Sequence, residues 1–352
     1  MELILNEDIF FVYKDGYFIA WNYVRHKQHR LSFSSIRAIL DCDFRRNNPN
    51  IENELFIANI LIDKSERTNY PQWSWDVLAR IFHLGTIKDK REEVISPKER
   101  AQEYVKYCNS INDEMGNDFF STERGDTLVS IHDIEELPDI GQLQALLENR
   151  RTNRSFSQEE LSLSYIMKIL DETFRYREHD HTEYAKRGLY TPTKRRSSPS
   201  GGALQSCEAY LISKNVSSIE SGVYHFRSHT SSLGLMSKLR QEFSFGELCS
   251  GQKFADGLSA FIVITCRFEK LMWKYKHSHA YRVSLLDAGH LSQTIHLLAT
   301  ALNIRTWVTG AFYDNEVRKL LGISIDSTEY PILIVGLGAG DLNPIDAYLN
   351  DY

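Results

Sequence analysis

The sequence predicts an α+β protein, and three observations predict it. Several short runs of β-branched and aromatic residues indicate strands. One long segment, 281–303, has apolar residues every three or four positions, as in an amphipathic helix. Strands and helices mix without regular strand–helix–strand repetition, which argues against a parallel, doubly wound sheet. At 352 residues the chain exceeds the usual size of one hydrophobic core, so we expect two domains.

The first 140 residues are expected to form a separate N-terminal region. Two β-rich runs, 9–13 and 17–21, flank an Asp15-Gly16 turn and predict a hairpin. Helical spacing follows at 32–40 and 53–62. A hairpin with short helices over the first 65 residues resembles a winged-helix-like fold. Such units often bind other macromolecules, and we expect this one to bind a peptide or a partner protein.

Further helices are expected over 70–82, which is aromatic, and 88–103, which is densely charged. A weaker pattern between 117 and 141 predicts a linker, so the predicted domains are 1–140 and 141–352. In the second domain a helix is predicted over 161–174, with Ser157 as its N-cap. The remaining predicted elements are strands at 208–216, 222–227, 258–266, 307–312 and 330–336, and the helix at 281–303.

Composition excludes several classes of function. With 41 basic and 47 acidic residues the net charge is −6, which gives no general attraction to nucleic acid or to an anionic membrane. No basic stretch and apolar run open the chain, and no apolar stretch reaches the roughly 18 residues that span a bilayer, so we expect a cytoplasmic protein. The five cysteines are widely spaced and expected to be reduced thiols. We expect no metal site, because His179-Asp180-His181 lacks further clustered ligands.

Two motifs in the second domain indicate a phosphate-bearing cofactor. Residues 149–156 carry three arginines within five positions, and residues 195–204 run from a basic pair into a Pro-Ser-Gly-Gly turn. Arginine offers a planar fork of donors that suits phosphate oxygens, and consecutive glycines let backbone N–H groups approach a flat or anionic ligand. The alternative is an exposed arginine-rich helix end and an ordinary turn.

A succession of motifs in one order resembles the nitroreductase superfamily, and within it the SagB-type dehydrogenases, which include the McbC-like FMN-dependent azoline oxidases. The likeness covers about residues 145–340. The motifs are 150–156 (Arg-Arg-Thr-Asn-Arg-Ser-Phe), 199–204 (Pro-Ser-Gly-Gly-Ala-Leu), 222–226 (Gly-Val-Tyr-His-Phe), Lys274-Tyr275, 286–293 (Leu-Asp-Ala-Gly-His-Leu-Ser-Gln) and 310–314 (Gly-Ala-Phe-Tyr-Asp).

The resemblance implies an FMN flavoprotein with a central antiparallel sheet flanked by helices, and a homodimer with the flavin at the subunit interface. The matching cofactor-binding positions are Arg150, Thr152 and Arg154 for the phosphate, Ser200 and Gly201 along the isoalloxazine, Gln293 on the bordering helix, and Thr309 and Gly310 in the turn facing flavin N5. Many nitroreductases also have basic phosphate ligands near the C-terminus. Here the corresponding stretch, 336–341, has none, so phosphate binding is assigned mainly to Arg150 and Arg154.

Lys274 and Tyr275 are the predicted catalytic pair, because a Lys-Tyr pair stands beside the flavin in the azoline oxidases that the chain resembles. Aromatising a thiazoline or oxazoline removes one proton from carbon and one hydride, so a base is needed. Lysine, with a reference pKa near 10.4, would need a dry or cationic pocket to be neutral, and Lys276 could supply repulsion. The alternative is an exposed loop after the strand at 258–266.

These features leave three hypotheses. The first is an FMN-dependent oxidase that aromatises azoline rings in a modified precursor peptide, alongside a cyclodehydratase partner, with dioxygen as the final acceptor. The second is an FMN-dependent nitroreductase or small-molecule oxidoreductase that uses a nicotinamide cofactor. The third is a non-catalytic scaffold subunit of a biosynthetic complex. No readable motif specifies the ring type or the substrate.

Overall fold

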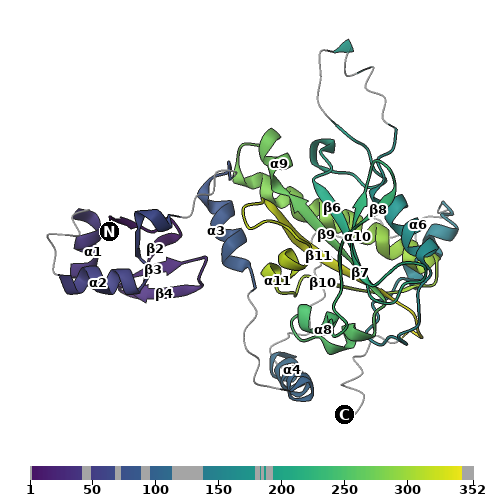
Figure 1. Ribbon diagram of the computed structural model, residues 1–352, viewed down its shortest axis with the longest axis horizontal. Helices are drawn as coiled ribbons and strands as arrows, with labels where there is room; N and C mark the ends of the chain where they lie inside the picture. Colours follow the sequence, from purple (N-terminus) through teal and green to yellow (C-terminus); the bar gives the residue numbers. More distant parts are fainter. Residues whose placement is uncertain are drawn as a thin grey trace, which may run out of the picture. The chain divides into compact units, whose positions relative to one another are not determined.

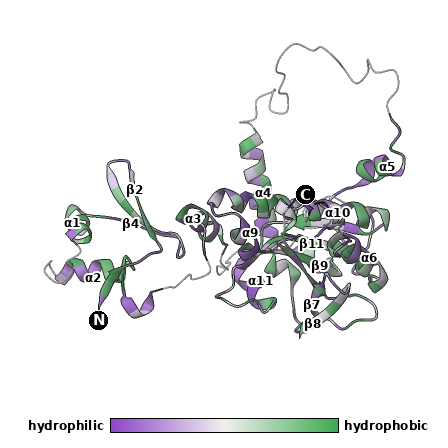
Figure 2. Ribbon diagram, turned by 90° about the horizontal axis from the view of Figure 1, so that it is seen from above, coloured by the Kyte–Doolittle hydropathy of each residue, from purple (hydrophilic) through white to green (hydrophobic). Residues whose placement is uncertain are grey.

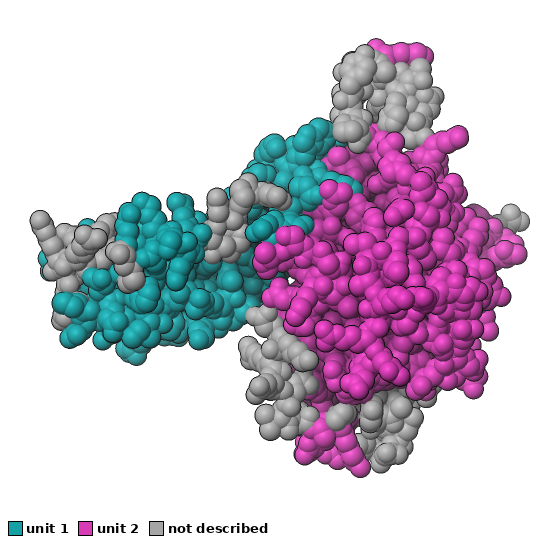
Figure 3. Space-filling model, viewed as in Figure 1, with its two compact units in different colours: residues 1–87, 269–281, 326–328 teal, residues 88–268, 282–325, 329–352 magenta. Residues whose placement is uncertain are grey.

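The computed structural model describes residues 2–41, 49–67, 73–88, 96–112, 138–178, 183, 186–187 and 193–342. The chain forms two compact units, coloured separately in Figure 3. Unit 1 contains Met1–Ile87, Glu269–Tyr281 and Asp326–Thr328. Unit 2 contains Lys88–Phe268, Arg282–Ile325 and Glu329–Tyr352. The division of the chain into functional domains at residue 140 stays a prediction.

Unit 1 begins with five short strands. β1 (Leu3–Leu5) pairs antiparallel with β5 (Leu61–Asp63), and β2 (Ile9–Lys14), β3 (Tyr17–Asn22) and β4 (Lys27–Arg30) form a three-stranded antiparallel sheet. The predicted hairpin is therefore confirmed. Its two turn residues, Asp15 and Gly16, have φ values of 53° and 84°, the left-handed conformation that a two-residue hairpin turn of type I′ needs.

Two helices, α1 (Phe33–Asp41) and α2 (Pro49–Ile57), share a small core with these strands, formed by Ala20, Ala38, Leu55, Ile60 and Leu61. The helix predicted over 53–62 was wrong at its C-terminal end. Asn59 has a φ of 56°, which breaks the helix, and the chain then enters β5. The winged-helix-like character of this region stays a prediction.

The rest of unit 1 comprises η1 (Lys64–Glu66), α3 (Val77–Thr86), most of α9 (Phe268–Lys274) and η5 (Ser278–Ala280). Asp76 caps α3 by accepting a hydrogen bond from the Leu78 N–H, at 2.9 Å. His83 of α3 lies buried, with its Nδ1 3.0 Å from the Tyr281 hydroxyl.

Unit 2 is built on a six-stranded sheet in the order β10-β11-β9-β6-β7-β8, with every neighbouring pair antiparallel (Figure 1). The strands are β6 (Cys207–Ser213), β7 (Gly222–Arg227), β8 (Ser232–Lys238), β9 (Ala260–Arg267), β10 (Arg305–Thr309) and β11 (Glu329–Gly338). The predicted central antiparallel sheet is confirmed. β8 was not predicted, because this edge strand is half exposed and short of β-branched residues.

The helices of unit 2 are α4 (Pro97–Asn112), α5 (Gln142–Asn149), α6 (Leu163–Phe174), α8 (Phe245–Leu248), α10 (Tyr281–Ala301) and α11 (Asp314–Leu320), with the short η3 (Gly201–Ala203) and η4 (Lys253–Gly257). Hydrophobic residues concentrate in strands such as β9 and β11 (Figure 2). At the centre of the core the Phe245 and Phe261 rings stack with their centroids 3.8 Å apart. α10 also buries part of its surface, including Ala288, Ile295 and Ala299.

The N-cap of α6 differs from the prediction. Ser162, rather than Ser157, accepts a hydrogen bond from the Ser164 N–H at 3.3 Å. Leu161 cannot be helical, because it forms a parallel bridge with Val216. The N-cap therefore lies five residues after the predicted Ser157, and the helix starts two residues after the predicted range.

Candidate functional site

The arginine-rich segment lies along the first residues of β10. α5 ends at Asn149, and the backbone continues in extended form from Arg150. Thr152 forms a parallel bridge with Thr306, and the Asn153 N–H donates to the Thr306 carbonyl at 2.8 Å. Alternate side chains of an extended segment project to the same side. Arg150, Thr152 and Arg154 are all half-buried, whereas Asn153 between them is fully buried.

A buried histidine that the sequence analysis did not single out lies beside this segment. His296 of α10 is 4% exposed, and its Nδ1 lies 2.8 Å from the Oγ1 of Thr306, which is 2% exposed. Burial and the positive charge of Arg150 lower the pKa of His296 to about 4. Arg150, His296 and Thr306 therefore form one cluster, with a cation at its half-buried side.

The Pro-Ser-Gly-Gly turn lies against the N-terminal half of the same helix. The Ser200 hydroxyl donates to the Asp287 carboxylate at 2.7 Å, and the Gly201 N–H donates to it at 3.1 Å. The Gln205 N–H in turn donates to Ser200 Oγ at 3.0 Å. Burial raises the pKa of Asp287, while the hydrogen bonds from Ser200 and Gly201 oppose that rise. Asp287 thus fixes the turn that the resemblance assigns to the isoalloxazine.

The two glycines of this turn serve different purposes. A Cβ on Gly201 would lie 2.2 Å from Val283 Cγ1, so the turn can approach α10 this closely only with glycine. Gly202 has a φ of 61°, in the left-handed region that favours glycine, and Ala203 follows with a φ of 54°. Gly201 is therefore needed for the close packing on α10, and Gly202 suits the left-handed backbone of the turn.

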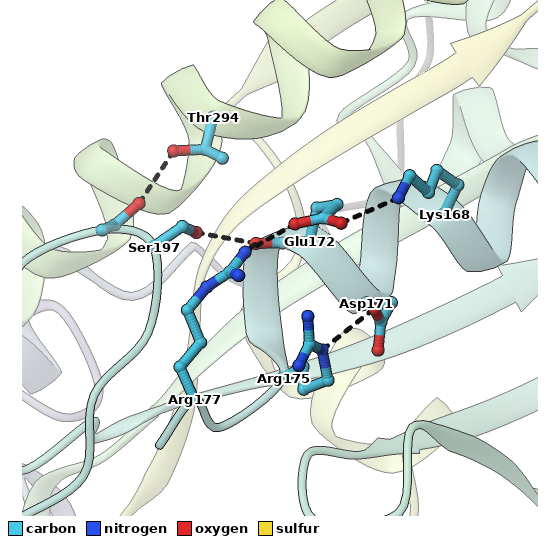
Figure 4. A network of polar contacts seen from close by, with 8 residues as sticks. Lys168, Asp171, Glu172, Arg175, Arg177, Ser197 and Thr294 are labelled. Atoms are coloured by element: carbon cyan, nitrogen blue, oxygen red, sulfur yellow. Dashed lines mark hydrogen bonds and ion pairs between the residues drawn. The ribbon is translucent and has the colours of Figure 1, made fainter. Parts of the chain in front are cut away.

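A polar network fixes the residues just before the turn (Figure 4). The Ser197 hydroxyl donates to the Glu172 carbonyl of α6 at 2.7 Å, and Ser198 Oγ lies 2.8 Å from Thr294 Oγ1 of α10. The Glu172 carboxylate accepts hydrogen bonds from Lys168 and Arg177, which lower its pKa to about 2. The turn is therefore attached to α6 as well as to α10.

Arg196, at the start of this turn, has a structural role. It is buried, and its guanidinium donates to the Cys207 carbonyl at 2.8 Å and to Ser228 Oγ at 3.0 Å. Its guanidinium carbon also lies 4.9 Å from the centroid of the Tyr176 ring.

The other predicted cofactor positions lie on the same two elements. Gln293 is exposed on α10, next to Thr294. Thr309 ends β10, where its Oγ1 accepts from the Ala311 N–H at 2.9 Å, and Gly310 after it is exposed. These side chains therefore lie on the same helix and strand as the two clusters described above.

The cluster around His296 and the cluster around Asp287 lie at different positions along α10. His296 follows Asp287 by nine positions, which corresponds to about 13 Å along a helix axis. All eight predicted cofactor-binding residues belong to unit 2. The structure links Arg150 to His296, Thr152 to Thr306, and both Ser200 and Gly201 to Asp287.

The predicted catalytic pair belongs to unit 1. Lys274 is exposed at the end of α9, with its Nζ 5.8 Å from the centroid of the half-buried Tyr275 ring. The Tyr275 carbonyl accepts from Trp75 Nε1 at 2.9 Å, which fixes the backbone here. Lys276 Nζ donates to the Met272 carbonyl at 2.9 Å. The pair is adjacent, and its place beside a cofactor stays a prediction.

Within the ranges that the structure describes, no group of three or more His, Cys, Asp or Glu side chains could hold a metal ion. None of the helices in these ranges is long and apolar enough to cross a membrane. His179, His181 and Cys42 lie outside the described residues.

Residues 147–339 match the family model described as the Nitroreductase family. The chain therefore belongs to the nitroreductase family, and membership indicates an oxidoreductase. The predicted superfamily and the nitroreductase-like fold are confirmed.

Three curated relatives are similar to the chain. The Methanocaldococcus jannaschii protein named "Putative nitroreductase MJ1384" is 29% identical over 217 residues, which are 61% of this chain and 98% of that protein. The microcin B17-processing protein McbC of Escherichia coli is 28% identical over 41% of this chain and 54% of McbC. The trifolitoxin-processing protein TfxB of Rhizobium leguminosarum bv. trifolii is 29% identical over 48% of this chain and 47% of TfxB. The chain thus spans about half the length of McbC and of TfxB.

Among solved structures, the E. coli microcin synthetase McbBCD complex with truncated pro-MccB17 bound aligns with a TM-score of 0.47 and 20% identity, over 70% of this chain and 95% of that one.

The residues of the cluster around α10 fit a phosphate-bearing flavin, which members of the family generally use. Arg150 supplies a half-buried cation. The Nε2 atom of His296 is buried and has no hydrogen-bond partner among the described residues, so its hydrogen-bonding capacity is unused. A Cβ at Gly310 would meet nothing within 4 Å, which leaves space beside the end of β10.

Proposed function

We propose that the chain is an FMN-dependent oxidase or dehydrogenase that aromatises thiazoline or oxazoline rings in a modified precursor peptide. One observation carries the proposal: a single helix, α10, is linked to both motifs. His296 bonds to Thr306, the bridge partner of Thr152, and feels the charge of Arg150, while Asp287 bonds to the Pro-Ser-Gly-Gly turn. Two relatives, McbC and TfxB, are named for processing microcin B17 and trifolitoxin. Their names support a peptide substrate. The proposed location of the protein is the cytoplasm.

The proposed roles of the binding residues follow from their chemistry. Arg150 and Arg154 neutralise the phosphate of FMN, and Thr152 donates a hydrogen bond to it. Ser200 and Gly201 are proposed to border the isoalloxazine, together with Gln293 on α10. The backbone at Thr309 and Gly310 is proposed to face flavin N5, where an N–H donor favours reduction.

Aromatisation of an azoline ring removes one proton and one hydride. Bound FMN would supply the hydride acceptor, with dioxygen as the final acceptor of the electrons. The Lys274 amine is proposed to take the proton from the ring carbon, and Tyr275 to donate a hydrogen bond to the ring heteroatom or to relay the proton. The Lys274 Nζ lies 5.8 Å from the centroid of the Tyr275 ring, and this short distance supports a joint role of the two side chains.

The proposed assembly is a homodimer that works with a cyclodehydratase, while the N-terminal extension binds the peptide. A second copy of the chain is supported by the exposed apolar side of α10, where Leu285 and Leu286 are 44% and 62% exposed beside the exposed Gly289. The small Gly289 would let another helix approach closely.

A second candidate function is reduction of nitro or quinone compounds with a nicotinamide cofactor. It is favoured by the match that spans nearly the whole of a relative named as a nitroreductase. The scaffold hypothesis is the third candidate, and the presence of Arg150 and Arg154, of the turn at 199–202 and of Lys274-Tyr275 argues against it.

Replacing Lys274 separates the first two functions. In Lys274→Ala we expect azoline oxidation to fall by about 100-fold, the usual size of a general-base contribution, while nitro reduction is retained. Lys276→Ala is the matched control, because Lys276 lies two positions from Lys274 and its Nζ donates to the Met272 carbonyl; we expect both activities to survive. If Lys274→Ala keeps full azoline oxidation, Lys274 is not the base. If the wild type reduces nitro compounds and never oxidises azoline peptides, the second function replaces the first.

A further inference from the structure

His296 has one ring nitrogen that its surroundings satisfy and one that they do not. Nδ1 lies 2.8 Å from the Thr306 hydroxyl, whereas Nε2 is buried without a hydrogen-bond partner among the described residues. Buried polar side-chain atoms usually have a partner, and leaving one unpaired costs free energy. A purely structural histidine would explain the bond at Nδ1 and leave Nε2 unexplained.

Both neighbours of this ring are linked to the segment proposed to bind phosphate. Thr306 bridges to Thr152, and Arg150 is the charged group whose field acts on His296. A half-buried guanidinium loses part of its hydration, and a nearby anion compensates for that loss. An anion beside Arg150 and His296 would pair with the charge and also occupy Nε2.

The protonation state of His296 suits a hydrogen-bond donor. Burial and Arg150 hold its pKa at about 4, so the ring is neutral at pH 7. A neutral imidazole carries one N–H. When the Thr306 hydroxyl donates to Nδ1, the ring proton must be on Nε2, the atom that has no partner.

We infer that His296 is a phosphate-binding residue, whose Nε2–H donates to a phosphate oxygen of FMN beside the Arg150 guanidinium, with Thr306 selecting the tautomer. This inference rests on the proposed FMN cofactor. It adds a ligand from α10 to a phosphate site for which the sequence indicated only 150–154, and which lacks the basic C-terminal residues of many nitroreductases.

The test compares the affinities of the flavin-free full chain for FMN and for riboflavin, which lacks the phosphate, by fluorescence titration. His296→Asn keeps a polar atom near the Nδ1 position and loses the donor at the Nε2 position. His296→Gln places an amide N–H near the Nε2 position. His83→Asn is the control, because His83 is also buried with its Nδ1 bonded to a hydroxyl, that of Tyr281.

We expect His296→Asn to weaken FMN binding about tenfold, the loss of one hydrogen bond to a charged group, and to leave riboflavin binding unchanged. His296→Gln should restore most of the FMN affinity, and His83→Asn should keep the wild-type ratio. An unchanged FMN-to-riboflavin ratio in His296→Asn overturns the inference and leaves the proposed function standing. Equal weakening of FMN binding and riboflavin binding would assign His296 a structural role and would also overturn the inference. A wild-type chain that binds neither flavin refutes the proposed function itself.

Discussion

Substituting Gly201 by alanine tests whether the turn must lie directly on α10. A Cβ at this position would be 2.2 Å from Val283 Cγ1, whereas carbon atoms in contact are normally about 3.5–4 Å apart. The two atoms would have to separate by about 1.3 Å to reach that distance. Valine in a helix is largely confined to one rotamer, so the methyl group cannot simply rotate away. The turn must then move, which strains the hydrogen bonds from Ser200 and Gly201 to Asp287.

Overpacking of this kind costs about 1–3 kcal/mol, so we expect Gly201→Ala to lower the free energy of unfolding by that amount and to weaken FMN binding. Val283→Ala removes the clashing methyl group. The double variant Gly201→Ala/Val283→Ala should therefore be more stable than the sum of the single effects predicts, by about 1–2 kcal/mol.

Urea unfolding of the wild type, both single variants and the double variant measures this coupling. Gly85→Ala is a matched control, because its Cβ would meet the Tyr23 Cβ at an ordinary 3.7 Å. We expect it to leave stability unchanged or to raise it, since alanine favours a helix over glycine. Additive effects of Gly201→Ala and Val283→Ala, or a fully stable Gly201→Ala, would refute the proposed close contact.

Three further predictions concern α10 and its neighbours. Asp287→Ala leaves the Ser200 hydroxyl and the Gly201 N–H without their acceptor, so it should destabilise the fold by about 1–3 kcal/mol in urea unfolding and lower FMN affinity. Folding lowers the pKa of His296 from 6.5 to about 4, so the unfolded chain binds the proton first as the pH falls. The free energy of unfolding should therefore decrease as the pH falls through 6.5 towards 4, by about 2 kcal/mol between pH 7 and pH 5. His296→Gln should not show this decrease. Arg150→Gln removes the cation that helps to lower the pKa of His296, so NMR titration should show a higher pKa for this residue. The increase should be small, because burial is the larger cause of the lowering. An unchanged pKa would show that the charge of Arg150 does not act on His296.

Local patterns predicted the elements whose signals lie close together in the sequence. The hairpin of β2 and β3 followed from Asp15-Gly16, because a two-residue type I′ turn needs left-handed residues. α10 followed from its helical periodicity over 281–303 and was observed at Tyr281–Ala301. In both cases the deciding interactions are within a few residues of each other.

Long-range contacts decided what the sequence could not predict. Ser157 and Ser162 both precede an apolar run, and only the bridge between Leu161 and Val216 shows which one caps α6. Asp287 and His296 are polar residues within an apolar helix. Their roles depend on Ser200 and Thr306, which are distant in sequence, so their partners could not be read from α10 alone.

The visible absorption spectrum of the purified chain, with release and identification of any bound chromophore, tests the central claim most directly. We predict a yellow protein that releases FMN at about one molecule per chain, because unit 2 has the nitroreductase fold and two polar clusters along α10 that we propose to bind the cofactor. A colourless protein that also fails to take up added FMN would contradict both flavin-dependent functions and leave the scaffold hypothesis.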